Sequence, residues 1–127
     1  MAQKIILIDD SQSTREQLSA VLTAAGYVTI EAEDGVEGAR LIRANPNAAL
    51  AICDLHMPKL SGLELLEMLH GESTVPFLML TTEGRVDLLE KARGFGAKGW
   101  MVKPFKPAML LAAVRKLGRM GSTERPM

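Results

Sequence analysis

The sequence predicts a single α/β domain, in which a parallel β-sheet is covered by helices on both faces. Five short apolar runs alternate with five stretches of helical spacing along the 127 residues. Four of the runs are nearly continuous instead of alternating, which is typical of strands that are buried on both faces of a parallel sheet. The length fits one domain with one hydrophobic core.

The strands are predicted from apolar runs of five, six, five, five and four residues. The expected strands are residues 4–8 (KIILI), 27–32 (YVTIEA), 49–53 (ALAIC), 76–80 (PFLML) and 99–102 (GWMV). The second run is the weakest, because it fades through Glu31 and Glu33 into a turn at Asp34-Gly35.

The helices are predicted from apolar spacing and from start and stop signals. The expected helices are residues 14–25, 35–44, 62–70, 85–95 and 107–118. Three capping patterns precede helices, namely Ser13 with Glu16, Asp34 with Glu37, and Ser61 with Glu64. Gly26 is placed to end the first helix, and Pro107 suits the first turn of the fifth. The third helix is expected to bury Leu63, Leu66 and Leu69.

Composition excludes several classes of protein. Cys53 is the only cysteine, so no intrachain disulfide is possible, and a reducing cytoplasmic location is expected. No apolar run is long enough to span a bilayer, and the first residues become charged too early for a secretory signal. We expect no membrane insertion. Residues 1–118 are expected to form the domain and 119–127 a flexible tail.

Charge is unevenly distributed, although the formal net charge is zero. Residues 1–84 contain 12 acidic and 5 basic residues, whereas residues 85–127 contain 3 acidic and 10 basic residues. This pattern fits either two solvated faces of opposite sign or an acidic site followed by a basic docking face. The basic residues are not interleaved with aromatic residues, which argues against direct binding of nucleic acid.

Chemically active side chains follow the predicted strands at one edge of the sheet. These are Asp9 and Asp10 after the first strand, Asp54 after the third, Thr81 and Thr82 after the fourth, and Lys103 after the fifth. Ligands of open parallel sheets bind beyond the carboxyl ends of the strands. Three clustered carboxylates repel one another unless a cation neutralises them, and Mg²⁺ suits such oxygen ligands. The set can hold a phosphoryl group, and a carboxylate can itself be the nucleophile.

The chain resembles the receiver domains of bacterial two-component response regulators, of the stand-alone CheY-like type. The resemblance covers residues 4–118 and rests on the motifs IDDS (8–11), EAEDGVEGARL (31–41), CDLHMPKLSGLELL (53–66), PFLMLTTEG (76–84) and GWMVKPF (99–105). It implies a flavodoxin-like (βα)5 sandwich with strand order 2-1-3-4-5.

The resemblance also implies a role for each matching residue. Asp54 is the expected phosphoacceptor, and Mg²⁺ is expected to bind Asp9, Asp10, Asp54 and the backbone carbonyl of His56. Thr81, Thr82 and Lys103 are expected to contact the phosphoryl group, with Lys103-Pro104 in the cis form. Trp100 takes the place of the switch aromatic residue, which is usually Tyr or Phe. His56 and Glu83 are expected to tune the lifetime of the aspartyl phosphate.

The implied function is a phosphorylation-activated switch, not a conventional enzyme. A sensor histidine kinase would donate the phosphoryl group, and a face of the fourth helix, fifth strand and fifth helix would bind a chemotaxis or motility target or a histidine phosphotransfer protein. The expected partner face is Arg85, Lys91, Arg93, Lys98, Trp100 and Lys106. No output domain is expected after residue 118, and a monomer is expected, with a dimer as the alternative.

Two alternative functions share part of this pattern of residues. A haloacid-dehalogenase-type phosphatase also uses an aspartate nucleophile, a hydroxyl, a lysine and Mg²⁺, but it needs an Asp-x-Asp motif where this chain has the adjacent pair Asp9-Asp10. A flavodoxin-like electron carrier needs a Ser/Thr/Gly-rich phosphate loop after the first strand, where Asp9 and Asp10 would repel the flavin phosphate.

Overall fold

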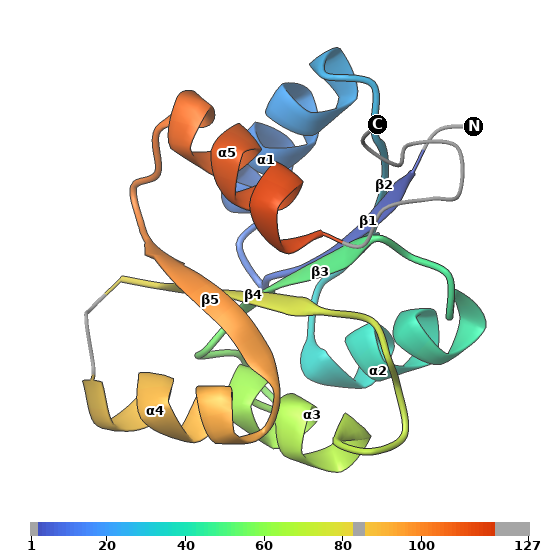
Figure 1. The fold of residues 1–127 in the computed structure, drawn as a ribbon, viewed down its shortest axis with the longest axis vertical. Coiled ribbons are helices and arrows are strands. Elements are labelled where there is room, and N and C mark those ends of the chain that lie inside the picture. Colours follow the sequence, from blue (N-terminus) through green and yellow to red (C-terminus); the bar gives the residue numbers. More distant parts are fainter. Residues whose placement is uncertain (1–2, 83–85, 119–127) are drawn as a thin grey trace.

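Strands and helices alternate along the chain as the sequence predicts (Figure 1). The structure, a computed structural model, describes residues 3–82 and 86–118. The elements are β1 (Lys4–Ile8), α1 (Gln12–Ala24), β2 (Val28–Ala32), α2 (Gly35–Ala44), β3 (Leu50–Asp54), α3 (Gly62–Leu69), β4 (Phe77–Thr81), α4 (Val86–Gly94), β5 (Ala97–Val102) and α5 (Pro107–Leu117). The predicted tail, residues 119–127, lies outside the described residues.

The five strands of the described chain form one parallel sheet in the order β2-β1-β3-β4-β5. This order confirms the flavodoxin-like topology. The chain reverses its direction of travel across the sheet between β1 and β3, where Ile8 is in register with Cys53. Such a switch point opens a crevice at the carboxyl edge of a doubly wound sheet.

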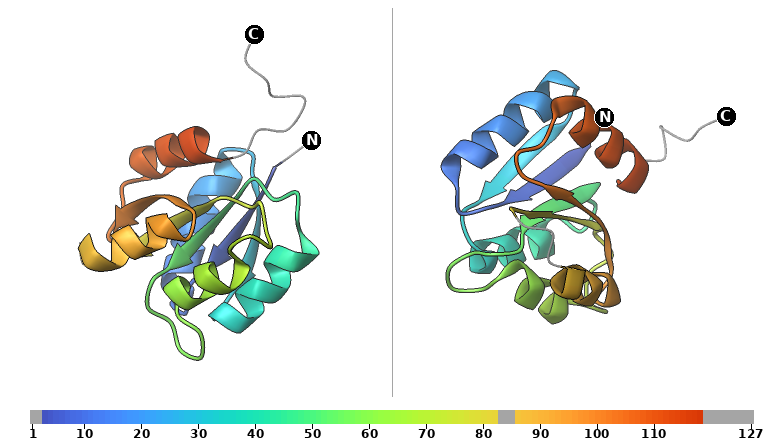
Figure 2. Two further views of the ribbon diagram at one scale, coloured as in Figure 1. Left: turned by 60° about the horizontal axis from the view of Figure 1, so that its bottom comes forward. Right: turned by 90° about the vertical axis from the view of Figure 1, so that its left-hand side faces the viewer.

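The helices form two layers, one on each face of the sheet (Figures 1 and 2). Helices α1 and α5 cover one face, and α2, α3 and α4 cover the other. In β1, Ile5 and Leu7 pack in the cluster beneath α1 and α5, whereas Ile6 and Ile8 pack in the cluster beneath α2, α3 and α4. Both faces of the central strands are therefore buried, which is why their apolar runs are continuous.

The edge strands differ from this pattern because each is covered less completely. Burial alternates along β5, where Ala97 and Met101 are buried and Lys98, Trp100 and Val102 are exposed. The prediction of a strand over 99–102 was too short, since β5 begins at Ala97. An exposed lysine at the second position interrupts the apolar run from which the strand was predicted.

The helix ends confirm most of the capping predictions. Asp34 accepts a hydrogen bond from Glu37 N at the start of α2, and Ser61 and Glu64 form a complete capping box on α3. Gly26 follows α1 with a φ of 98°, a conformation that side chains disfavour, and Pro107 begins α5.

Two predictions about helices were wrong. Helix α1 is capped by Ser11, whose side chain accepts from Thr14 N, and not by Ser13. The chain turns into the helix earlier because Ser11 N donates to Asp9 Oδ1 at 2.8 Å. On α3, Leu65 is fully buried, whereas Leu63 is only partly buried against the core. None of the helices in residues 3–82 and 86–118 combines the length and the apolar character needed to cross a membrane.

Candidate functional site

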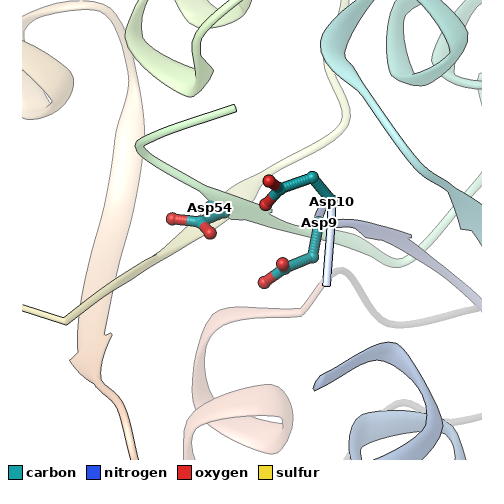
Figure 3. A group of neighbouring side chains, drawn as sticks. All are labelled: Asp9, Asp10 and Asp54. Carbon is teal, nitrogen blue, oxygen red and sulfur yellow. The ribbon is translucent and has the colours of Figure 1, made fainter. Parts of the chain in front are cut away.

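Three aspartates meet beyond the switch point of the sheet (Figure 3). Asp9 and Asp10 directly follow β1, and Asp54 is the last residue of β3. Each offers a carboxylate oxygen, and these oxygens all lie within 4.8 Å of one another. Asp9 and Asp54 are buried, and Asp10 is exposed. The structure thus brings together the three acids that the sequence predicted at one edge.

Lys103 supplies the positive charge at this cluster. Its Nζ lies 2.9 Å from Oδ2 of Asp9 and 3.0 Å from Oδ2 of Asp54. Burial by itself would lower the pKa of Lys103, but its close contacts with the carboxylates of Asp9 and Asp54 outweigh this effect, so the pKa lies above its ordinary value. Lys103 is therefore a firmly protonated ammonium group that bridges two of the three carboxylates.

The donor set fits a hard dication. Oδ2 of Asp9 is fully buried and accepts no well-oriented hydrogen bond from the described residues, although Lys103 Nζ is in ion-pair contact with it. An under-satisfied buried carboxylate oxygen beside two further carboxylates is a suitable ligand for Mg²⁺, which is bound through a few carboxylates and several waters. Asp10 is exposed, so the cluster has one carboxylate in contact with solvent.

Both oxygens of Asp54 have a donor nearby. Oδ1 accepts from the backbone N of His56 at 3.1 Å, and Oδ2 accepts from Lys103 Nζ at 3.0 Å. The adjacent Cys53 is fully buried, and burial, followed by the charges of Asp54 and Asp9, raises the pKa of its thiol. Cys53 is therefore a packing residue, and Asp54 is the residue of the strand end whose carboxylate belongs to the acidic cluster.

The other predicted contacts of a phosphoryl group come from β4 and the segment after β5. Thr81 is the fully buried last residue of β4, and Thr82 follows it at the surface. Backbone N of Lys103 donates to Thr81 O at 2.8 Å, which fixes the two segments side by side. The Lys103-Pro104 bond is cis, as expected. The side chain of His56 is exposed, and its backbone carbonyl as a metal ligand stays a prediction, whereas Glu83 lies outside the described residues.

A supporting residue that the sequence did not reveal is Arg15, near the start of α1. Its Nη1 donates to the backbone carbonyl of Asp9 at 2.5 Å, and its Nε pairs with Oε1 of Glu31 on β2 at 3.0 Å. These contacts fasten the acidic end of β1 to the edge strand. A signal was present, because a cation in the first turn of a helix opposes the helix dipole and needs a specific acceptor.

The predicted partner face is exposed, as docking requires. Its described members lie on α4, on β5 and just before α5, namely Lys91, Arg93, Lys98, Trp100 and Lys106. The sixth member, Arg85, lies outside the described residues. The guanidinium of Arg93 lies 5.5 Å from the centroid of the Trp100 ring, and Trp100 is 42% exposed. Val102 is also exposed on β5, so the face combines basic and apolar groups.

The fold and the site together define a flavodoxin-like α/β protein with an acidic centre at its switch point that could hold a metal ion. Comparison with known proteins makes the assignment specific. The family model for the response regulator receiver domain matches residues 5–115. The chain therefore belongs to the response regulator receiver domain family and is CheY-like. Receiver domains are switches of two-component signalling and not conventional enzymes.

Relatives and solved structures agree with this assignment. The chemotaxis protein CheY homolog of Campylobacter jejuni is 34% identical over 125 residues, which cover 95% of this chain and 96% of that protein. The chemotaxis protein CheY4 of Vibrio cholerae superimposes with a TM-score of 0.86 at 33% identity, covering 92% of this chain and 99% of that one. CheY in a CheX–CheY–BeF3–Mg complex from Borrelia burgdorferi superimposes with a TM-score of 0.84 at 28% identity, covering 90% and 87%.

Some relatives are longer than this chain. The probable transcriptional regulator ycf27 of Porphyridium aerugineum is 40% identical over 118 residues, which cover 92% of this chain but 48% of that protein. The chain spans about half the length of several such regulators. Similarity over a shared domain supports the receiver assignment, and it leaves the output of the whole protein as a matter for proposal.

Proposed function

We propose that the protein is a phosphorylation-activated switch in which Asp54 accepts a phosphoryl group from the phosphohistidine of a sensor histidine kinase. The observation that carries this proposal is the placement of Asp54 beside Asp9, Asp10 and Lys103 at the mouth of the sheet. Phosphoryl transfer depends mostly on positioning and charge stabilisation, and this site supplies a nucleophile, a fixed cation and metal ligands.

In the proposed step, a carboxylate oxygen of Asp54 forms a bond to phosphorus. The bond between phosphorus and the imidazole nitrogen of the kinase breaks, its electron pair returns to the imidazole, and the imidazole takes up a proton. Lys103 stabilises the negative charge on the transferring oxygens from its position 3.0 Å from Asp54. Asp9 and Asp10 would hold Mg²⁺ together with Asp54, and that ion supplies further charge stabilisation when it is bound.

The product changes the charge at the end of β3. An aspartyl phosphate, like other phosphorylated side chains, adds about −1.5 to −2 charges at neutral pH. Lys103 lies 3.0 Å from Asp54, and we propose that it contacts the new charge together with Thr81 and Thr82 at the end of β4. Lys103 also continues directly from β5, which carries Trp100. A rearrangement of Trp100 on β5 would change the face formed by α4, β5 and α5. A partner that prefers one arrangement would then bind the phosphorylated and unphosphorylated forms with different affinities.

The partner face fits an acidic protein surface. Lys91, Arg93, Lys98 and Lys106 supply positive charge around the exposed Trp100. The downstream partner is proposed to be a chemotaxis or motility target or a histidine phosphotransfer protein. Its test is the affinity for that target after Lys91→Glu and Arg93→Glu, measured at low and high salt. Affinity that is insensitive to both changes would contradict an electrostatic docking face.

The central experiment is intact-mass analysis after incubation with acetyl phosphate and Mg²⁺. A mass increase of one phosphoryl group is expected, and it should be absent in Asp54→Asn and after removal of Mg²⁺ by a chelator. Glu67→Gln, which removes an exposed carboxylate of α3, is the matched control and should be modified normally. An adduct in Asp54→Asn would overturn the assignment of the acceptor.

The phosphatase alternative is not supported by the comparisons, because the chain belongs to the receiver family. The first strand of this chain is also followed by the adjacent pair Asp9-Asp10 and not by an Asp-x-Asp motif. Rapid turnover of phosphate esters by the purified protein would revive this alternative.

A further inference from the structure

The loop between β3 and α3, residues 55–61, contains a strained turn. Lys59 has a φ of 69°, and it is the one residue other than glycine with positive φ in the described parts of the chain. Leu60 N donates to Pro58 O at 2.7 Å, so Lys59 is the central residue of a three-residue γ-turn. The form of this turn with positive φ is rare and strained, and such strain persists only where the surroundings hold it in place.

The start of this loop is hydrogen-bonded to Asp54, and its end packs closely against the backbone of Asp54. At the start, His56 N donates to Oδ1 of Asp54 at 3.1 Å. At the end, Gly62 N donates to Leu55 O at 3.0 Å, and a Cβ on Gly62 would lie 2.1 Å from the backbone O of Asp54. A displacement of the loop would therefore change the position of His56 N against the carboxylate of Asp54.

The middle of the loop is held by the start of α2, which is distant in sequence. Nζ of Lys59 lies 3.3 Å from Oδ2 of Asp34, while Oδ1 of Asp34 caps α2 by accepting from Glu37 N at 2.8 Å. One carboxylate thus joins the helix to the loop. The backbone of the loop also touches the helix, since a Cβ on Gly35 would lie 2.3 Å from Leu60 O and 2.8 Å from Leu60 Cβ.

We infer that Asp34 and Gly35, at the N-terminus of α2, and their partner Lys59 are positioning residues for the phosphoacceptor site. They hold the β3–α3 loop in its strained turn and thereby keep His56 N on Oδ1 of Asp54. Asp34 and Lys59 do not touch the reacting atoms, and they act through the loop. One measurement of this inference, the hydrolysis rate of an aspartyl phosphate, rests on the proposed function of Asp54. The other, the state of the His56 amide, does not depend on phosphorylation.

The test uses three variants of the intact chain. Asp34→Asn keeps a side chain that caps helices well and removes the charge that attracts Lys59. Lys59→Met removes the charge from the other side. Gly35→Ala pushes on Leu60, whereas Gly38→Ala adds the same methyl group to the same helix but meets only side-chain atoms of Ile8, the nearest at 2.9 Å. Gly38→Ala is thus the matched control for a general loss of stability.

Two measurements are made on each variant. The first is the amide NMR shift and hydrogen-exchange rate of His56, which report its bond to Asp54 without any phosphorylation. The second is the rate at which the aspartyl phosphate hydrolyses after loading with acetyl phosphate and Mg²⁺. For Asp34→Asn and Lys59→Met we expect the hydrolysis rate to change about two- to fivefold, as fits an ion pair with one exposed partner, Lys59. For Gly35→Ala we expect the hydrolysis rate to change about tenfold or more, because the backbone at Leu60 must move to make room for the added methyl group.

The possible outcomes separate the two proposals. A changed His56 amide in the three variants, with little change in Gly38→Ala, supports the positioning role. An unchanged His56 amide and hydrolysis rate in all three variants would overturn it. The positioning role would also be overturned if the three variants changed the His56 amide and the hydrolysis rate no more than Gly38→Ala does at the same loss of stability. If the wild-type protein itself takes up no phosphoryl group, the proposed function fails, and the His56 amide still decides the inference.

Discussion

Nζ of Lys103 lies 3.0 Å from Oδ2 of Asp54, a residue 49 positions earlier in the chain, and it also contacts Asp9. The parallel sheet makes this contact possible, because it places the carboxyl ends of distant strands at one edge. Before any metal or phosphoryl group binds, Lys103 is the cation that allows the acidic residues to lie together.

The first prediction concerns the removal of this cation. Lys103→Met should destabilise the protein by about 1–3 kcal/mol without Mg²⁺, because it leaves the buried carboxylates of Asp9 and Asp54 without their counterion. Mg²⁺ should restore more stability to the variant than it adds to the wild type. Urea unfolding with EDTA and with Mg²⁺ measures both effects. The control is Lys98→Met, which removes an exposed lysine of β5 outside the site. Equal stability of the Lys103→Met and Lys98→Met variants would contradict the prediction.

The second prediction concerns the metal site. Mg²⁺ should stabilise the wild type by about 2.7 kcal/mol at a concentration 100 times its dissociation constant. Asp10→Asn should be at least as stable as the wild type without Mg²⁺, because one repulsive charge is gone, and should lose most of the gain with Mg²⁺. Thermal unfolding over a Mg²⁺ titration tests this. Glu33→Gln, an exposed acid outside the cluster, should respond as the wild type does.

The third prediction concerns pH. The backbone N–H of Glu37 has the largest effect on Asp34 and lowers its pKa below the ordinary value of 3.8; burial opposes this effect, and Lys59 adds a smaller lowering. A lowered pKa stabilises the folded state above pH 3.8, and this contribution is lost as the pH falls through the folded value. Asp34→Ala should cost about 1 kcal/mol at neutral pH, as for other N-caps.

The control for this pH effect is Asp34→Asn, which still caps the helix but cannot titrate. The difference in stability between Asp34→Asn and the wild type should shrink in acid, as measured by urea unfolding between neutral pH and pH 3. A difference that stays constant over this range would show that Asp34 contributes no proton linkage.

The fourth prediction concerns Trp100, which is the only tryptophan, so its fluorescence is specific. Arg93→Ala should shift the emission to longer wavelength and increase quenching by iodide, because the guanidinium 5.5 Å from the ring centroid is lost. The stability loss should be small, about 0.5–1 kcal/mol. Lys98→Ala should leave the spectrum nearly unchanged, and equal effects of the two variants would argue against the stacked arrangement.

The fifth prediction concerns the proposed switch. Mg²⁺ with beryllofluoride should change the fluorescence of Trp100, because the proposed rearrangement of β5 alters its surroundings. The titration should be flat in Asp54→Asn. A flat response of the wild type would count against a switch role for Trp100 while leaving the acceptor role of Asp54 open to the mass measurement.

The central strands and the main site residues could be predicted from the sequence because both depend on local patterns. A continuous apolar run identifies a strand buried on both faces, and the residue after it must lie at the carboxyl edge. Asp9, Asp10, Asp54, Thr81 and Lys103 follow from this rule alone. The full length of β5 could not be predicted in this way, because burial alternates along this edge strand and its second residue is the exposed Lys98.

Other features depend on specific contacts that the apolar pattern and the capping signals do not reveal. Ser11 and Ser13 are both plausible caps of α1, and the contact of Ser11 N with Asp9 decides between them. The contact of Arg15 with the carbonyl of Asp9 requires the turn between β1 and α1 to be known. The pair of Lys59 and Asp34 depends on the packing of Leu60 against Gly35, which no local pattern encodes.

The position of Lys103 late in the described chain has a consequence for biosynthesis. A chain that leaves the ribosome exposes Asp9, Asp10 and Asp54 well before Lys103 is made. A truncated chain that stops before β5 has the acidic edge without its resident cation, and it also lacks the outer strand that pairs with β4. A site that contains its resident cation therefore marks a domain whose synthesis has passed β5, and the same late segment completes both the sheet and the charge arrangement of the site.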